Sequence, residues 1–187
     1  MDEDVRRIAA EIPRLRRYAR ALLRNDDRAD DLVQETLLRA LDKLHLYRSG
    51  TDLRAWLFTM MHNQYVNHIR RWLRQREKIG IERVRAPHAS PPTQMVGIEL
   101  RDVERAIQRL SEEQRTTLLL IALEGMRYEE VAKICSIPIG TVRSRLSRAR
   151  KELREMMEPS DIPSAARPNI VLHDRAEVGD ETHSLTA

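Results

Sequence analysis

The sequence predicts an all-α protein with two small helical domains joined by a flexible linker, the second of which contains a helix-turn-helix. Residues 1–78 have almost continuous helical character, with Gly50 as the only glycine and Pro13 as the only proline. Helical periodicity resumes at residue 98 and continues to residue 158, and no stretch alternates as a strand does. Between these segments, residues 79–97 contain three prolines and two glycines, which is the composition of a linker.

The length of the chain and the composition of its C-terminal part support this organisation. A chain of 187 residues holds one domain or two small ones. Pro159, Pro163 and Pro168 follow the last helical pattern, and the last 30 residues carry six acidic and two basic side chains. We therefore expect residues 159–187 to form a disordered tail.

Composition and charge exclude several classes of protein. Lys and Arg exceed Asp and Glu by four, and the pI of about 9.6 permits nucleic-acid binding. Cys135 is the only cysteine, so no internal disulfide can form, and no histidine accompanies it at the spacing of a zinc site. No apolar run approaches the roughly 20 residues of a membrane span, and the charged start MDEDVRR is unlike a secretory signal. We expect a cytoplasmic protein that holds no metal and no cofactor.

The most specific local pattern is the helix-turn-helix of residues 128–150, YEEVAKICSIPIGTVRSRLSRAR. A first helix is expected over residues 128–135, and a second from about Pro138 to residue 156. The side chains expected to be buried in the first helix are Val131, Ala132 and Cys135. Such turns usually place glycine where the backbone is left-handed, so here Ser136 or a neighbour must adopt that conformation, at about 1 kcal/mol.

The second helix has a basic face opposite an apolar stripe. The stripe consists of Val142, Leu146, Ala149 and Leu153. The residues placed to meet base edges in a major groove are Arg143, Ser144, Ser147 and Arg148. Those better placed for phosphates are Arg145, Arg150, Lys151 and Arg154. The alternative is an ordinary amphipathic helix with a solvated basic face.

Residues 29–46 form an amphipathic helix whose polar face is acidic. At 100° per residue the apolar face contains Val33, Thr36, Leu37, Ala40, Leu41 and Leu44. The other face contains Asp31, Gln34, Glu35 and Asp42, and Leu38 lies among them. A surface leucine is common in proteins, but an apolar residue ringed by acids is also typical of a surface that docks on a basic partner helix. Both interpretations stay open at this point.

Residues 53–76 follow the polar loop Arg48–Asp52 and form a basic, amide-rich helix. Trp56 and Phe58 are expected in the core. The side chains suited to a single-strand backbone and unstacked bases are Asn63, Asn67, Arg70, Arg71 and Arg74, with Tyr65 or Trp72 as an aromatic platform. The alternative is that the arginines form a solvated helix end.

With these three features in this order, the chain resembles the extracytoplasmic-function (ECF) sigma factors, the smallest group of bacterial sigma-70-type factors. The resemblance rests on RADDLVQETLLRAL (28–41), LRAWLFTMMHN (53–63) and LSEEQRTTLLLIALEGMRYEEVAKICSIPIGTVRSRLSRARKEL (110–153). RADDLVQETLLRA and RAWLFT are most similar to the alphaproteobacterial general-stress branch, in which the inhibitor is a small helical anti-sigma protein. The string MMHNQYVNHIRRW departs from the family's usual pattern, which leaves the −10 preference open, and Ser136 is the other departure.

The resemblance implies a role for each segment. Residues 1–78 would be sigma domain 2, which docks on the coiled-coil clamp of the polymerase's largest subunit through Asp30, Asp31, Leu32, Gln34, Glu35 and Leu38. The same domain would melt and capture the −10 element with Arg48, Ser49, Asn63, Asn67, Arg70, Arg71 and Arg74. Residues 98–158 would be sigma domain 4, which reads the −35 element through Gly140, Thr141, Arg143, Ser144, Ser147 and Arg148.

The function expected from this resemblance is promoter-specific transcription initiation under the control of an anti-sigma factor. The chain is not expected to be an enzyme, because no paired carboxylates, nucleophile–base pair or glycine-rich phosphate loop stands out. One alternative is a sigma-like decoy for an anti-sigma factor, although such decoys normally carry a receiver domain and need no basic recognition helix. The other is a helix-turn-helix regulator that binds DNA unaided, which would leave the acidic face around Leu38 unexplained.

Deletion of residues 160–187 is expected to leave promoter-specific transcription unchanged, because the tail lies outside the resemblance to the family. The measurement is transcription in a system reconstituted with core polymerase, with the full chain as the reference. An inactive truncated chain would show that the tail takes part in function.

Overall fold

The structure, a computed structural model, describes residues 2–23, 25–79 and 98–157 and confirms the all-α prediction. These residues form seven α-helices and one short 3-10 helix joined by turns and loops, and none of them is in a strand. The expected linker, apart from Ile79, and the expected tail lie outside the described residues. The domain boundaries expected from the sequence stay predictions.

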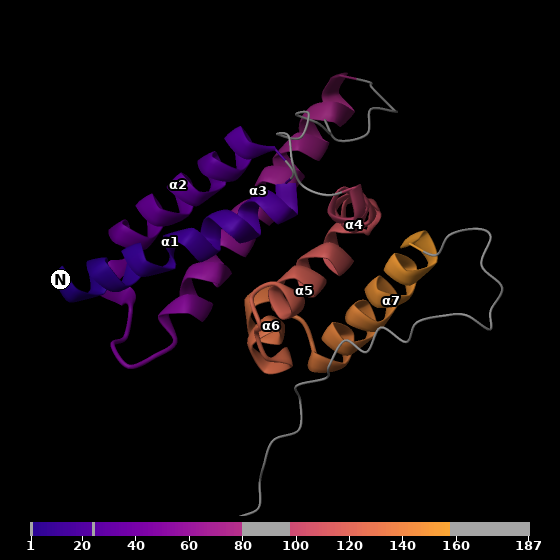
Figure 1. Cartoon of the computed structure of the whole chain (residues 1–187). Helices are drawn as coiled ribbons and strands as arrows, with labels where there is room; N and C mark the ends of the chain where they lie inside the picture. Colours follow the sequence, from indigo (N-terminus) through magenta and orange to yellow (C-terminus); the bar gives the residue numbers. More distant parts are fainter. Residues whose placement is uncertain (1, 24, 80–97, 158–187) are drawn as a thin grey trace, which may run out of the picture. The chain divides into compact units, whose positions relative to one another are not determined.

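The first helical segment contains α1 (Asp2–Leu23), α2 (Asp26–Asp42), the 3-10 helix η1 (Leu44–Leu46) and α3 (Leu53–Ile79). The helices α1, α2 and α3 run alongside one another (Figure 1). The buried residues of α1 recur at helical spacing, so one face of this helix forms core: Ile8, Leu15, Tyr18 and Leu22. Asn25 is the N-cap of α2, because its side-chain oxygen accepts a hydrogen bond from the backbone N–H of Arg28 at 2.8 Å.

The apolar face of α2 matches the expected one except at its edge. Val33, Thr36 and Ala40 are buried, and the Thr36 hydroxyl is satisfied by donating to the Leu32 carbonyl at 2.7 Å. Leu41, which we expected on this face, is 47% exposed. It stands about 80° from Val33 around the helix, so it reaches the rim of the face rather than the core.

The second segment contains α4 (Ile98–Arg109), α5 (Glu112–Ala122), α6 (Tyr128–Cys135) and α7 (Ile139–Met157). A capping box begins α5, since Ser111 and Gln114 each bond the other's backbone N–H. The helices α6 and α7 confirm the predicted helix-turn-helix, and α7 buries Val142, Leu146 and Ala149 as its stripe indicates.

The turn between α6 and α7 has the conformation that the sequence predicted. Ser136 is left-handed at φ 54°, and it is the only described non-glycine residue with positive φ. One detail of α6 differs from expectation: Ile134 is buried with Val131, whereas Ala132 and Cys135 are half-buried. The buried face of α6 is therefore centred on Val131 and Ile134, which lie on the same side of the helix because they are three residues apart.

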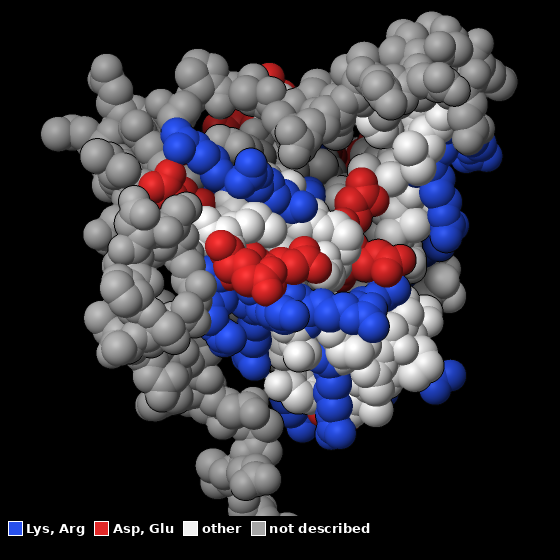
Figure 2. Space-filling model, turned by 90° about the vertical axis from the view of Figure 1, so that its right-hand side faces the viewer, with Lys and Arg blue, Asp and Glu red and all other residues white. Residues whose placement is uncertain are grey.

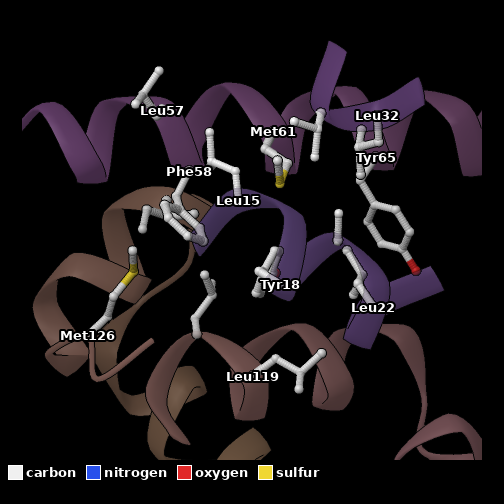
Figure 3. Packing of buried hydrophobic residues seen from close by; sticks show 14 of the residues in the cluster. Leu15, Tyr18, Leu22, Leu32, Leu57, Phe58, Met61, Tyr65, Leu119 and Met126 are labelled. Carbon is white, nitrogen blue, oxygen red and sulfur yellow. The ribbon is translucent and has the colours of Figure 1, made fainter. Parts of the chain in front are cut away.

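The two segments share one hydrophobic core. Figure 3 shows Tyr18 and Leu22 of α1 between side chains of α3 and Leu119 of α5. Tyr18 is 1% exposed and meets the edge of the Phe58 ring at a centroid distance of 5.2 Å. The same cluster continues into Met126 and the helix-turn-helix.

Polar side chains of the second segment bond the carbonyl end of α1. The buried Arg115 donates to the Leu22 carbonyl at 3.3 Å, and Gln108 donates to the Ala21 carbonyl at 2.7 Å. Arg115 also bonds the carbonyls of Gln108 and Leu110 at the end of α4. These contacts satisfy carbonyls that a helix terminus otherwise leaves without partners.

Substitution of Ser136 by glycine is expected to raise the free energy of unfolding by roughly 0.5–1 kcal/mol. Glycine removes the cost of a left-handed side chain, and its greater freedom in the unfolded chain offsets part of that gain. Urea unfolding monitored by circular dichroism is the measurement. Ser144→Gly, within helical α7, is the matched control and is expected to lower stability instead. If Ser136→Gly and Ser144→Gly lowered the free energy of unfolding by the same amount, the left-handed turn would contain no strain that glycine relieves.

Candidate nucleic-acid interface

The outward face of α7 presents the residues expected to meet base edges. Arg143, Ser144, Ser147 and Arg148 are all exposed, and so is Gly140 at the start of the helix. Thr141 is half-buried, and its carbonyl accepts the Ser144 hydroxyl at 3.0 Å. The face is continuous over two helical turns, which is the length that a recognition helix inserts into a major groove.

The residues expected at phosphates fall into two groups. Arg150, Lys151 and Arg154 line a groove of about 380 Å³ together with Arg143 and Ser147. The groove therefore joins the base-facing positions to three further cations, as a DNA backbone track requires.

Arg145 differs from that expectation. Its guanidinium donates to Glu113 of α5 at 2.6 Å, and its side chain is only 21% exposed. Figure 2, which shows the side of the molecule where α7 lies, has a row of acidic side chains between bands of Lys and Arg. Arg145 thus links α7 to α5 in this structure, and its role at a phosphate stays a prediction.

The outer face of α3 presents the amides and arginines expected at single-stranded DNA. Asn63, Asn67, Arg70, Arg71 and Arg74 are exposed. Arg48 and Ser49 are also exposed, in a loop held by the Tyr47 hydroxyl, which donates to the Thr51 carbonyl at 2.6 Å. Trp56 is half-buried rather than fully in the core and packs on the Tyr47 ring at 5.2 Å.

Tyr65 is not available as the aromatic platform that the sequence suggested. It is 3% exposed, and its burial raises the pKa of the phenol to about 12. Among the nearby charges, Glu112 of α5 raises the pKa of the phenol further and Arg115 of α5 lowers it. His62 of α3 likewise has a lowered pKa because of its burial and the nearby Arg145. Trp72 is half-buried.

The acidic face of α2 is exposed where the sequence predicts docking. Asp31, Gln34 and Glu35 are exposed, and Leu38 is 68% exposed. Asp30 is half-buried, 3.9 Å from Arg16 of α1. Leu32 is different, because it is fully buried and can only hold α2 against the core.

A groove that the sequence did not predict connects α2 and α3. It has a volume of about 390 Å³, and Glu35 and Leu38 line it on one side, with Asn67 and Arg71 on the other. His68 Nε2 lies 2.9 Å from a carboxylate oxygen of Glu35, so these two side chains connect α3 to α2 at the groove. The expected docking surface and the expected single-strand surface therefore adjoin. The sequence does not predict this proximity, because the residues lie about 30 positions apart and only the antiparallel packing of α2 and α3 brings them together.

The described residues contain neither a candidate metal site nor a candidate membrane span. Within those residues, no three His, Cys, Asp or Glu side chains are grouped so that they could hold a metal ion. No helix in the same part of the chain is both long and apolar enough to cross a membrane.

Two family models match the chain, one in each helical segment. Residues 8–62 match the Sigma2 domain of PhyR, and residues 100–153 match Sigma-70, region 4. Together the two matches cover α2, most of α1 and the whole helix-turn-helix.

Curated relatives match most of the chain. The ECF RNA polymerase sigma factor EcfG of Rhodopseudomonas palustris is 40% identical over 154 residues, which are 80% of this chain and 82% of that protein. The ECF RNA polymerase sigma factor SigC of Mycobacterium tuberculosis is 34% identical over 142 residues, 72% of each chain.

Solved structures show the same fold. The sigma factor RpoE of Bartonella quintana, crystallised with the anti-sigma factor NepR, is 35% identical with a TM-score of 0.74. The match covers 83% of this chain and 97% of that one. The PhyRSL–NepR complex from Sphingomonas matches with a TM-score of 0.58 at 23% identity, which shows a common fold alone.

Proposed function

Because this chain belongs to the ECF RNA polymerase sigma factors, we propose that it grips a promoter at two points while its acidic α2 face holds core polymerase. The helix α7 would read the −35 element as duplex, and the outer face of α3 with the Arg48–Asp52 loop would capture the −10 element. The observation that supports this division is the exposure of three surfaces on three different helices: a basic face on α7, an amide-rich face on α3 and an acidic face on α2.

At the −35 element, the exposed side chains of α7 would act by direct readout. Arg143 and Arg148 can each give two hydrogen bonds to guanine, and Ser144 and Ser147 can donate or accept at base edges. Arg150 and Lys151 would bind phosphates, which position the helix without reading sequence. Arg145 would join them only after releasing Glu113.

At the −10 element, α3 would stabilise bases that have left the duplex. Unstacking costs a few kcal/mol per step, so the captured bases must regain that energy from amide and arginine contacts. Asn63 and Asn67 supply the amides, and Arg70, Arg71 and Arg74 continue toward the strand backbone. Polymerase binding supplies the remaining energy through the clamp, because linked sites share their binding free energy.

The docking surface for polymerase would centre on Leu38. Its side chain is the most exposed large apolar one among the described residues, and Asp31, Gln34 and Glu35 surround it on the same helix. An apolar anchor with an acidic rim complements a basic coiled coil such as the clamp of the largest subunit.

The chain would also bind an anti-sigma factor similar to NepR. The supporting observation is the RpoE–NepR complex, whose sigma chain matches 83% of this one at 35% identity. That level of identity, with both helical segments included, favours a partner of the same class and the general-stress branch.

A decoy for an anti-sigma factor is the second candidate, because residues 8–62 match the Sigma2 domain of PhyR. Anti-anti-sigma PhyR from Bartonella quintana shares the fold at 18% identity, and this chain spans 49% of its length. A decoy has no use for the exposed basic face of α7. Transcription with core polymerase alone separates the two candidates, since a decoy would be inactive in that assay.

Combined Arg143→Ala and Arg148→Ala is expected to lower promoter-specific transcription about 100-fold while binding to core polymerase is unchanged. Each lost bidentate contact removes about 1–3 kcal/mol of discrimination. In-vitro transcription and a polymerase pull-down measure the two properties. Arg105→Ala with Arg109→Ala, on exposed positions of α4, is the control and should be active. Weakened polymerase binding in the α7 variant would refute the separation of roles.

Leu38→Arg is expected to weaken binding to core polymerase about 30-fold, because it removes a central apolar anchor and adds charge that repels a basic partner. The matched control is Leu46→Arg, at a leucine of similar exposure in η1. Asp31→Arg should act in the same direction as Leu38→Arg. If both α2 variants bind polymerase as the unchanged chain does, the docking surface lies elsewhere.

A further inference from the structure

A buried amide lines the groove between α2 and α3. Gln64 of α3 is only 6% exposed, and its side chain forms part of the groove wall. Its amide nitrogen, Nε2, is buried and has no hydrogen-bond partner among the residues that the structure describes. A buried donor without an acceptor costs free energy, because it has given up its bonds to water. An acceptor that entered the groove would recover that free energy.

The α3 wall of the groove consists of side chains that suit nucleic acid. Gln64, Asn67, His68 and Arg71 lie at i, i+3, i+4 and i+7, so they form one stripe along the helix, which we call the groove stripe. Amides can bond the edge of a base, and an imidazole or a guanidinium can stack on its face. Asn67 and Arg71 also belong to the exposed face proposed for strand capture. A strand held on that face would therefore lie beside the groove.

The groove stripe is separate from the loop proposed for the −10 element. That loop, Arg48–Asp52, ends where α3 begins at Leu53. Gln64 lies 11 residues further along α3, which is roughly 16 Å along the helix axis. The groove is therefore a further subsite and not a part of the loop.

Charge and volume favour a single base as the occupant of the groove. Its walls contain two carboxylates, Glu35 and Asp42, and two guanidiniums, Arg39 and Arg71. A phosphate would meet both carboxylates and a cationic side chain would meet both guanidiniums, so like charges disfavour either. A base is neutral and has donors and acceptors along its edge. The volume of about 390 Å³ is at the lower end of the range for small-molecule sites, which suits one base.

The contact between Glu35 and His68 can give way to such a base. Their side chains are 50% and 37% exposed, so each can turn toward solvent. Exposed pairs of this kind contribute little to stability. A base that entered would find the Glu35 carboxylate as an acceptor for its N–H groups and the His68 ring beside it.

We propose that the groove binds one unstacked base of the promoter strand, and that Gln64 reads this base by donating its Nε2 hydrogen to an acceptor on the base edge. The inference rests on the proposed capture of the −10 strand by α3, because only a melted strand offers a base that has left its pair. Gln64 is therefore a specificity-determining residue for one position of the −10 element.

The test is transcription by the holoenzyme, formed from the full chain and core polymerase, on a pool of randomised promoters. A barcode in each transcribed region identifies the promoters that are used and gives the base preference at each position. Gln64→Leu removes the donor and should reduce the preference at one −10 position from roughly tenfold to less than about twofold. Preferences at the other positions should be unchanged. Gln75→Leu is the matched control, because Gln75 is an exposed glutamine of α3 outside the groove, and it should change no preference.

A second arm removes the base in place of the side chain. A promoter with an abasic sugar at the affected position of the non-template strand should be transcribed about tenfold less by the unchanged chain. The Gln64→Leu chain has already lost this contact, so the same abasic sugar should lower its transcription by no more than about twofold. Equal losses in the two chains would overturn the proposal.

Thermal unfolding separates a lost contact from a lost fold. Leucine leaves no donor unsatisfied, so Gln64→Leu should unfold at or above the temperature of the unchanged chain. Gln64→Met, which is unbranched and also lacks the donor, is the second variant and should behave in the same way. Loss of fold in both variants would show that Gln64 supports the core, and would overturn the proposal.

The remaining outcomes are also decisive. Unchanged preferences in a folded Gln64→Leu chain would overturn the proposal, and so would a uniform fall in transcription without a change in preference. Weaker polymerase binding with unchanged preferences would overturn it too, because the groove would then hold a side chain of polymerase. If the unchanged chain supports no promoter-specific transcription, the proposed function itself fails and this inference fails with it.

Discussion

The burial of Tyr18 between α3 and α5 is the contact on which the rest of this fold depends. Its ring is 1% exposed, packs on the Phe58 edge and has α5 side chains on its other side. Burial this complete also raises the pKa of its phenol well above the usual value. Because α1 is apolar on the face that both segments share, α3 and α5 must each turn an apolar face toward it, and their remaining faces are available to partners.

That arrangement places three surfaces of different chemistry on the outside of one small core. The acidic face of α2 with Leu38, the amides and arginines of α3, and the basic face of α7 each belong to a different helix. The groove at Glu35 and Asn67 brings the first two surfaces together, so the surfaces proposed for polymerase docking and for strand capture share a boundary. Arg17 of α1 and Arg54 of α3 also lie 2.9 Å and 3.7 Å from the buried carboxylate of Glu124, in the loop between α5 and α6.

Much of the candidate site could be predicted from the sequence, because helical periodicity assigns residues to faces. The limits of α6, the stripe of α7 and the left-handed Ser136 all follow from local pattern and turn chemistry. Exposure of Leu38 follows from its position among acids. The residues whose surroundings the sequence did not predict are those that meet another element. Tyr65 is buried near the charges of Glu112 and Arg115, and Arg145 is paired with Glu113.

The sequence by itself therefore determined the helices, their polar and apolar faces, and the family whose motifs they carry. Only the tertiary structure decided that the two segments share one core and that Glu124, between α5 and α6, meets Arg17 and Arg54. The reason is physical. A helix face is set by residues three and four apart, whereas burial of a charge depends on groups brought together from about 70 and about 107 positions away.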